Sequence, residues 1–142
     1  MLEIEKLKSP NAEYLTGKDK DMENKKVVVT GGAGFLGSQV VELLLKKGNF
    51  VVVLDDFSNG KMSHLAHLRN DSRLKIYRGD ITNINDVKIA FEDCNIVIHL
   101  AVLDLRQSII EPQRVSKVIV DGTLNCLDVA RSNNVELFPV DR

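Results

Sequence analysis

The chain has 142 residues, enough for one domain with its own core but short for a cofactor enzyme that also carries a substrate domain. Its 19 Lys and Arg and 20 Asp and Glu give a net charge of −1, which argues against nucleic acid or a membrane surface as the partner. No apolar run reaches the roughly 18 residues that cross a bilayer, and the first residues are too charged for a signal peptide, so we expect a cytoplasmic protein.

Residues 1–24 are densely charged with both signs and are interrupted by Pro10 and Gly17. They offer only a short apolar stripe, so we expect a mobile charged tail there. The folded domain is expected over residues 25–142.

A glycine-rich turn joins the first predicted strand to the first predicted helix. The β-branched run at 26–30 predicts a buried strand, and the apolar periodicity from Leu36 predicts a helix over 36–47. Between them, Gly31, Gly34 and Gly37 have the spacing of a dinucleotide-binding turn. Such a turn lets a pyrophosphate approach the backbone, where the first N–H groups of the helix and its dipole favour an anion.

A carboxylate follows the second predicted strand, 50–54. Asp55 lies about 20 residues after the glycine turn, where an acidic residue binds the adenosine ribose of a dinucleotide. Asp56 beside it would repel the 2′-phosphate of NADP, so the pair favours NAD. The rival triphosphate loop, G-x-x-x-x-G-K-[ST], aligns on Gly32 and Gly37 but needs lysine where this chain has Ser38.

The rest of the chain alternates helices and strands. Helices are predicted over 62–69, 83–93 and 112–132, strands over 73–78, 95–101 and from 135, and a loop between 101 and Pro112. In the longest helix, the expected packing face is Val115, Val118, Ile119, Gly122 and Leu127. Right-handed crossovers then give an α/β fold, an incomplete Rossmann-type doubly wound parallel sheet of about five strands in the order 3-2-1-4-5.

Five motifs occur in order: TGGAGFLGS at 30–38, LDDFSNGK at 54–61, GDIT at 79–82, VIHLA at 97–101 and DGTLNCLDVAR at 121–131. With Ser108 and Pro112 they resemble the extended short-chain dehydrogenase/reductases, and among these the nucleotide-sugar epimerases and dehydratases of the UDP-glucose 4-epimerase type. The resemblance implies an NAD-binding domain whose family chemistry is transient hydride transfer on a UDP- or dTDP-sugar.

The resemblance also implies roles for individual residues. The backbone amides of Phe35 and Leu36 would bind the NAD pyrophosphate, and Asp55 would bind the adenosine ribose. The other implied contacts are Asn59 and Lys61 near the same end, Asp80 and Ile81 around the adenine, and Leu100, Ala101 and Val102 on the nicotinamide side.

The catalytic elements that the resemblance implies are a Ser/Thr pair on the fifth strand and a Tyr-x-x-x-Lys on the next helix, which move a proton while NAD takes a hydride. This chain has Pro139 and Val140 at the first of these places and its sequence ends at Arg142. We therefore expect no catalytic residue in the chain, and we predict that it binds the cofactor without turning over a substrate.

Two positions depart from the family pattern within the cofactor site. Ile119 stands where the family has an asparagine that helps to order the cofactor phosphates, and Val102 stands where it has a small residue. Both changes predict weaker NAD binding than the glycine turn alone suggests.

Three functions stay open at this point. The chain is the NAD-binding part of an epimerase or dehydratase, a non-catalytic NAD-sensing or interaction module, or an enzyme half completed by a second subunit or another polypeptide. A nucleotide sugar is a partner only of the completed enzyme. We expect no metal site, because His64 and His67 lack a third ligand, and we expect Cys94 and Cys126 to be buried reduced thiols.

Overall fold

The computed structural model describes residues 22–139, so the tail expected over residues 1–24 lies largely outside the described residues. The chain folds around a parallel sheet in the order β3-β2-β1-β4-β5. The strands are β1 (Lys26–Thr30), β2 (Phe50–Asp55), β3 (Leu74–Arg78), β4 (Ile96–His99) and β5 (Glu136–Pro139). The predicted fold class and strand order are confirmed.

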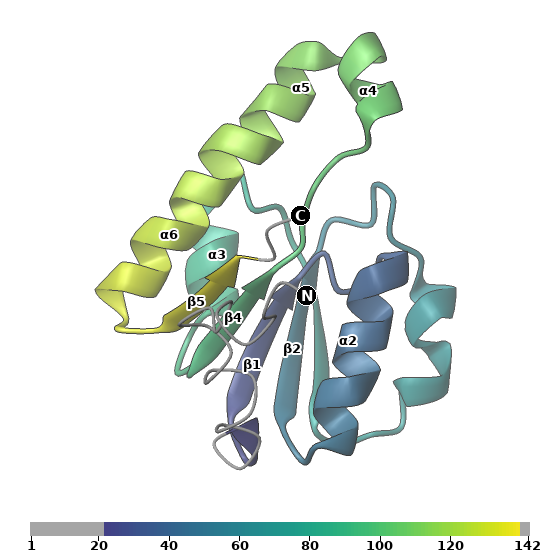
Figure 1. The fold of residues 1–142 in the computed structure, drawn as a ribbon, viewed down its shortest axis with the longest axis vertical. Coiled ribbons are helices and arrows are strands. Elements are labelled where there is room, and N and C mark those ends of the chain that lie inside the picture. The colour runs from purple at the N-terminus through teal and green to yellow at the C-terminus, as the bar shows by residue number, and fades with distance from the viewer. Residues whose placement is uncertain (1–21, 140–142) are drawn as a thin grey trace, which may run out of the picture.

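Helices cover both faces of the sheet (Figure 1). One face packs against α2 (Phe35–Lys46) and the 3₁₀ helix η3 (Met62–Leu68). The other face packs against α3 (Ile84–Ala90), α5 (Pro112–Lys117) and α6 (Thr123–Ser132). The short helix α4 (Leu105–Ile110) lies beyond the carboxyl ends of the strands. No helix within residues 22–139 has both the length and the apolar character needed to cross a membrane.

The central strand β1 contributes to the core on both sides. Val28 belongs to the cluster that contains Val87 of α3 and Val115 of α5. Val27 belongs to the opposite cluster, which contains Val41 of α2. Because successive side chains of a strand point to opposite faces, an unbroken β-branched run is buried only where helices cover both faces. The composition of β1 thus fixes its place inside the sheet.

The connecting segments differ in part from the prediction. The loop predicted before Pro112 is wrong, because 105–110 form α4, and the Asp104 side chain begins this helix by accepting a hydrogen bond from the Gln107 N–H at 2.9 Å. The helix predicted over 62–69 is a 3₁₀ helix, with the His64 N–H donating to the Lys61 carbonyl at 3.0 Å. The helix predicted over 83–93 is shorter and ends at Ala90.

The helix predicted over 112–132 is one long rod of three parts, α5, the π-helical turn η4 (Val118–Gly122) and α6 (Figure 1). The predicted packing face is wrong at Ile119 and Leu127, which are 42 % and 43 % exposed. The buried face instead continues from Val118 and Gly122 to Cys126 and Val129, at spacings of three and four residues.

Candidate functional site

The glycine turn lies between the end of β1 and the start of α2, at the carboxyl edge of the sheet (Figure 1). Gly31 has a φ of +70°, and a Cβ atom there would lie 2.8 Å from the Ala101 nitrogen. A Cβ atom on Gly37 would overlap the Gly31 carbonyl oxygen and lie 2.8 Å from the Gly32 Cα. Only residues without a Cβ allow α2 to pack this closely on the turn.

The first turn of α2 faces solvent without a side-chain cap. Gly34 is its N-cap residue, no described side chain caps its N–H groups, and its first turn holds no acidic residue. The side chains of Phe35 and Leu36 are 77 % and 54 % exposed. Uncapped N–H groups and the positive end of the helix dipole together favour an anion at this position.

Asp55 joins the glycine turn to the loop after β2. Its Oδ2 accepts a hydrogen bond from the Ala33 N–H at 2.9 Å, and its Oδ1 accepts one from the Phe57 N–H at 2.8 Å. The residue is 8 % exposed, and burial raises the pKa of its carboxyl group. An ionised carboxylate accepts about four hydrogen bonds, so Asp55 retains acceptor capacity for a ligand.

Several parts of the chain meet in a narrow pocket beside Asp55, which Val118 also lines. They are the ends of β1 and β2, the segment 79–81 after β3, and the segment 101–103 after β4. The pocket measures about 40 Å³, well below the roughly 300 Å³ at which small-molecule pockets start, so it would hold only part of a ligand. We call it the crevice. The predicted site residues that line it are Gly31, Asp55, Asp56, Asp80, Ile81, Ala101 and Val102.

The remaining predicted site residues do not line this pocket; they are Gly34, Phe35, Leu36, Gly37, Asn59, Lys61 and Leu100. Asn59 donates from Nδ2 to the Gln107 Oε1 at 3.2 Å, which joins the loop after β2 to α4. The Lys61 N–H donates to the Ala33 carbonyl at 3.0 Å, and His64 Nδ1 lies 2.7 Å from the same oxygen. These contacts hold the glycine turn against the 57–64 segment.

Thr30, the last residue of β1, is a site residue that the sequence prediction missed. It is fully buried, and its hydroxyl oxygen accepts hydrogen bonds from the Leu100 N–H at 3.1 Å and the Ala101 N–H at 3.2 Å. The same oxygen lies 2.7 Å from Nδ1 of His99, which is its partner in the register of β1 and β4. The sequence signal that could have identified Thr30 is a hydroxyl residue placed directly between an apolar strand and a glycine turn.

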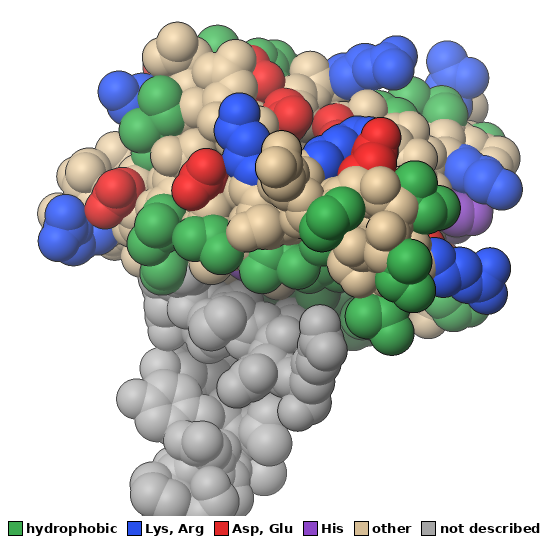
Figure 2. Space-filling view, turned by 90° about the horizontal axis from the view of Figure 1, so that it is seen from above, with side chains coloured by type: hydrophobic (Ala, Val, Ile, Leu, Met, Phe, Trp, Pro, Cys, Tyr) green, Lys and Arg blue, Asp and Glu red, His purple; other side chains and the backbone are tan. Residues whose placement is uncertain are grey.

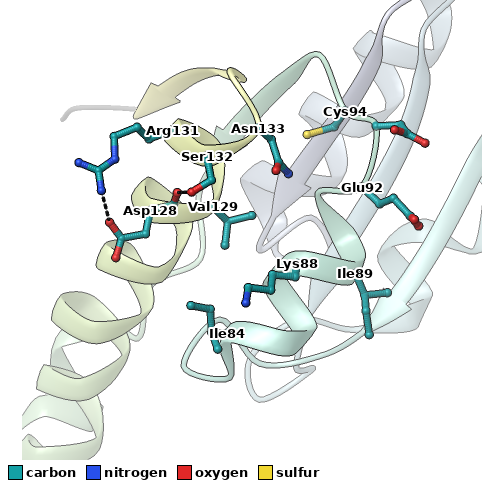
Figure 3. A pocket seen from close by; sticks show the side chains of 11 residues that line it. Ile84, Lys88, Ile89, Glu92, Cys94, Asp128, Val129, Arg131, Ser132 and Asn133 are labelled. Carbon is teal, nitrogen blue, oxygen red and sulfur yellow. Dashed lines mark hydrogen bonds and ion pairs between the residues drawn. The ribbon is translucent and has the colours of Figure 1, made fainter.

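A larger hollow lies at the opposite, amino edge of the sheet, between α3 and α6 (Figure 3). Its volume is about 840 Å³, and its walls carry charges of both signs, including Lys88, Asp128 and Arg131. Arg131 and Asp128 pair with each other at 3.5 Å. None of the predicted site residues lines this hollow. We therefore place the candidate site at the glycine turn, where backbone donors and a buried carboxylate converge.

The pocket itself is lined by three carboxylates and no basic side chain, whereas the surface around it has no dominant sign of charge. Figure 2 shows the carboxyl edge of the sheet from above, with acidic and basic side chains interspersed on it. Such a face gives no long-range steering of a strongly charged macromolecule. Within the described part of the chain no group of three or more His, Cys, Asp or Glu residues could hold a metal ion. Cys94 and Cys126 are buried free thiols, as predicted.

Comparison with known proteins places this geometry in a family. Residues 27–140 match the sequence model of the NAD dependent epimerase/dehydratase family. A putative UDP-glucose 4-epimerase from Methanocaldococcus jannaschii is 31 % identical over 112 residues, which are 78 % of this chain and 35 % of that protein.

Solved structures give the same result. An epimerase from Methanothermobacter thermautotrophicus is 28 % identical, with a TM-score of 0.80 over 92 % of this chain and 39 % of that one. The UDP-glucose 4-epimerase of Thermus thermophilus, in complex with NAD, is 34 % identical, with a TM-score of 0.69 over 79 % of this chain and 36 % of that one. The chain thus spans about a third of the length of the relatives that it matches.

Proposed function

The chain belongs to the NAD dependent epimerase/dehydratase family, and from that premise we propose that its glycine turn and Asp55 bind NAD as the cofactor-binding part of a nucleotide-sugar epimerase or dehydratase. The family match confirms NAD as the cofactor predicted from the sequence. The observation that carries the proposal is that the Asp55 carboxylate, which lines the crevice, accepts the Ala33 N–H at 2.9 Å, two residues before the uncapped start of α2.

The residues present fit the parts of a dinucleotide. The N–H groups of Phe35 and Leu36 begin α2 and would receive the pyrophosphate. Asp55 would accept from the ribose hydroxyls, Asp80 and Ile81 would border the adenine, and Ala101 and Val102 would border the nicotinamide. Asn59, Lys61 and Leu100 are proposed to support these contacts from the rim. When bound, NAD supplies the hydride acceptor of the family chemistry.

The charges on the ribose side favour NAD over NADP. Asp56 lines the same pocket as Asp55, and its Oδ1 accepts hydrogen bonds from the Ser58 N–H at 2.9 Å and the Ser58 hydroxyl at 2.6 Å. These bonds fix the second carboxylate next to the first. A 2′-phosphate would approach two carboxylates with no basic side chain among the pocket-lining residues, so repulsion would weaken its binding.

We propose that the chain binds NAD without completing the reaction. Tyr77 is the only tyrosine in the described residues, and its hydroxyl donates to the Asp86 Oδ1 at 3.2 Å. Burial and the Asp86 carboxylate raise the pKa of Tyr77, whereas a proton-transferring tyrosine needs a lowered one. Epimerisation or dehydration of a UDP- or dTDP-sugar then belongs to a larger or completed protein, and the cytoplasmic location stays a prediction.

Two alternatives keep the same cofactor site. In the first, the chain is a non-catalytic module that senses NAD or binds a partner protein. In the second, another subunit or polypeptide supplies the proton-transferring residues. Both are compatible with a parallel sheet that ends in β5, whose outer edge has no partner strand among the described residues.

Calorimetric titration of the 142-residue chain tests the proposal. We expect NAD to bind at least about tenfold more tightly than NADP, and we expect Asp55→Asn to weaken NAD binding and narrow this ratio. Asp128→Asn removes an exposed carboxylate at the opposite edge and should leave both affinities unchanged. An absence of binding heat with NAD would contradict the proposal.

A UDP-glucose turnover assay separates the alternatives. Turnover by the chain alone would show that the catalytic residues are present after all. Turnover only after a second polypeptide is added would favour completion in trans.

A further inference from the structure

Side chains in the first turn of α6 form hydrogen bonds that lead to both walls of the crevice. One wall is the segment 79–81 and the other is the segment 101–103. Thr123 begins α6 immediately after the π turn, and Asn125 follows two residues later. Neither residue lines the pocket, and both are half-buried behind it. The turn therefore sits where it can act on the walls without contacting a ligand.

On the 79–81 side, α6 approaches the chain very closely. A Cβ atom on Gly122 would lie 2.5 Å from the Ile81 Cδ1, so glycine is what allows the helix to reach this loop. Asn125 then donates from Nδ2 to the Ile81 carbonyl at 2.9 Å. On its other side the loop is held by Asp86, whose Oδ2 accepts from the Asp80 N–H at 2.9 Å. The segment 80–81 is thus held from both sides, at Asp80 by Asp86 and at Ile81 by Asn125.

On the 101–103 side, α6 acts through a chain of hydrogen bonds. Thr123 Oγ1 lies 3.0 Å from His99 Nε2, and His99 Nδ1 lies 2.7 Å from Thr30 Oγ1. The Thr30 oxygen already accepts the N–H groups of Leu100 and Ala101. The Leu100 N–H is shared with the Thr30 carbonyl oxygen, which lies 3.1 Å away. With two N–H groups on the Thr30 hydroxyl oxygen, the geometry favours donation of the hydroxyl proton to His99 Nδ1.

This arrangement favours one tautomer of His99. Because Nδ1 accepts, the neutral ring carries its proton on Nε2 and donates it to Thr123. Burial lowers the pKa of His99, which keeps the ring neutral. A chain of hydrogen bonds therefore connects the Thr123 hydroxyl, through His99 and the Thr30 hydroxyl, to the backbone amides of Leu100 and Ala101.

We propose that Thr123 and Asn125 are positioning residues, each of which holds one wall of the crevice. Thr123 holds the wall at 100–101 through His99 and Thr30, and Asn125 holds the wall at Ile81. The inference rests on the proposed function, in which the wall at Ile81 borders the adenine and the wall at Ala101 borders the nicotinamide. Each residue should then affect a different half of the dinucleotide.

The test compares NAD with ADP-ribose, which lacks the nicotinamide ring, on the full chain. Loss of one hydrogen bond of this kind changes an affinity by about three- to tenfold. Thr123→Val should raise the Kd of NAD by this factor and change the Kd of ADP-ribose by less than about twofold. Thr123→Ser keeps the hydroxyl and should bind NAD like the wild type. Asn125→Ala should raise both Kd values equally.

Asn133→Ala is the matched control. Asn133 is the same residue type at the other end of α6, and it donates to the Phe91 carbonyl at 3.5 Å, away from the crevice. It should change neither Kd. If Thr123→Val and Asn125→Ala weaken the two ligands in the same way, or weaken neither, the inference is overturned.

A measurement without a ligand separates this inference from the proposed function. The imidazole ¹⁵N spectrum should show His99 as the Nε2–H tautomer, and amide exchange at Ala101 should accelerate in Thr123→Val but not in Asn125→Ala. Binding of NAD together with an Nδ1–H tautomer, or with unchanged exchange in Thr123→Val, would overturn the inference alone. A chain that binds neither ligand would overturn the proposed function.

Discussion

Gly37→Ala is the substitution whose effect the structure defines most closely. The added methyl group would overlap the Gly31 carbonyl oxygen and would lie 2.8 Å from the Gly32 Cα and 2.9 Å from the Gly31 carbonyl carbon. All three atoms belong to the backbone, so no side chain can rotate away. The start of α2 must therefore move away from the glycine turn.

The size of the effect follows from two opposing terms. Overpacking of this kind costs about 1–3 kcal/mol, and alanine in place of glycine in a helix returns up to about 1 kcal/mol. We expect a net loss of about 1–2 kcal/mol in the free energy of unfolding, which lowers a urea midpoint by about 1 M when the m-value is about 1–2 kcal/mol/M. Displaced amides of Phe35 and Leu36 should also raise the Kd of NAD at least about tenfold.

Urea denaturation and calorimetry of Gly37→Ala and Gly34→Ala check this reasoning. A Cβ atom on Gly34 would lie 3.2 Å from the Gly31 oxygen, and Gly34 has a φ of −70°, which any residue adopts. Its alanine variant should therefore lose less stability than Gly37→Ala, because its one close contact needs a shift of only a few tenths of an ångström. A Gly37→Ala chain with wild-type stability and NAD affinity would show that the close packing of α2 on the turn is not real.

Three further outcomes follow from buried groups. Burial lowers the pKa of His99. As the pH falls below about 6.5, the unfolded chain therefore takes up a proton before the folded chain does, and the stability of the fold decreases. The urea midpoints at pH 7.5 and pH 5.5 should differ less in His99→Gln than in wild type. Burial raises the pKa of Cys94 to about 11 and of Cys126 to about 12, so iodoacetamide at pH 8 should label them only after unfolding, as mass spectrometry would show. Gly122→Ala places a Cβ 2.5 Å from Ile81 Cδ1, an overpacking cost of about 1–3 kcal/mol that the better helix propensity of alanine offsets by up to about 1 kcal/mol. Ile81→Val should partly relieve the remaining loss in a double-mutant cycle.

Several features of the site could be read directly from the chain. Gly31 and Asp55 are far apart in the sequence, yet the spacing and the two apolar runs before them predict that they meet at the ends of neighbouring strands. The register confirms this, because Thr30 pairs with Leu54, the residue before Asp55. Asp80 and Ala101 likewise follow strands and reach the same pocket. In each case a strand end and the parallel topology were sufficient.

Other features of the structure could not be predicted from the sequence pattern. Ile119 and Leu127, which the helical periodicity placed in the core, are exposed, whereas Cys126 is buried. The bonds from Asn125 to Ile81 and from Asn59 to Gln107 cross 44 and 48 positions between surface loops and helices. Nothing in the local sequence encodes these pairs, because they depend on how far a helix is rotated and how closely it approaches.

The sequence by itself determined the parallel order of the strands, the position of the glycine turn and the carboxylate beside it, because strand alternation, crossover handedness and glycine spacing are local or topological constraints. Only the tertiary structure decided which polar side chains hold the crevice walls, since Thr30, His99, Thr123 and Asn125 become partners only after the sheet and α6 have packed. Hydrogen bonds act over about 3 Å, a distance that packing sets and chain position does not.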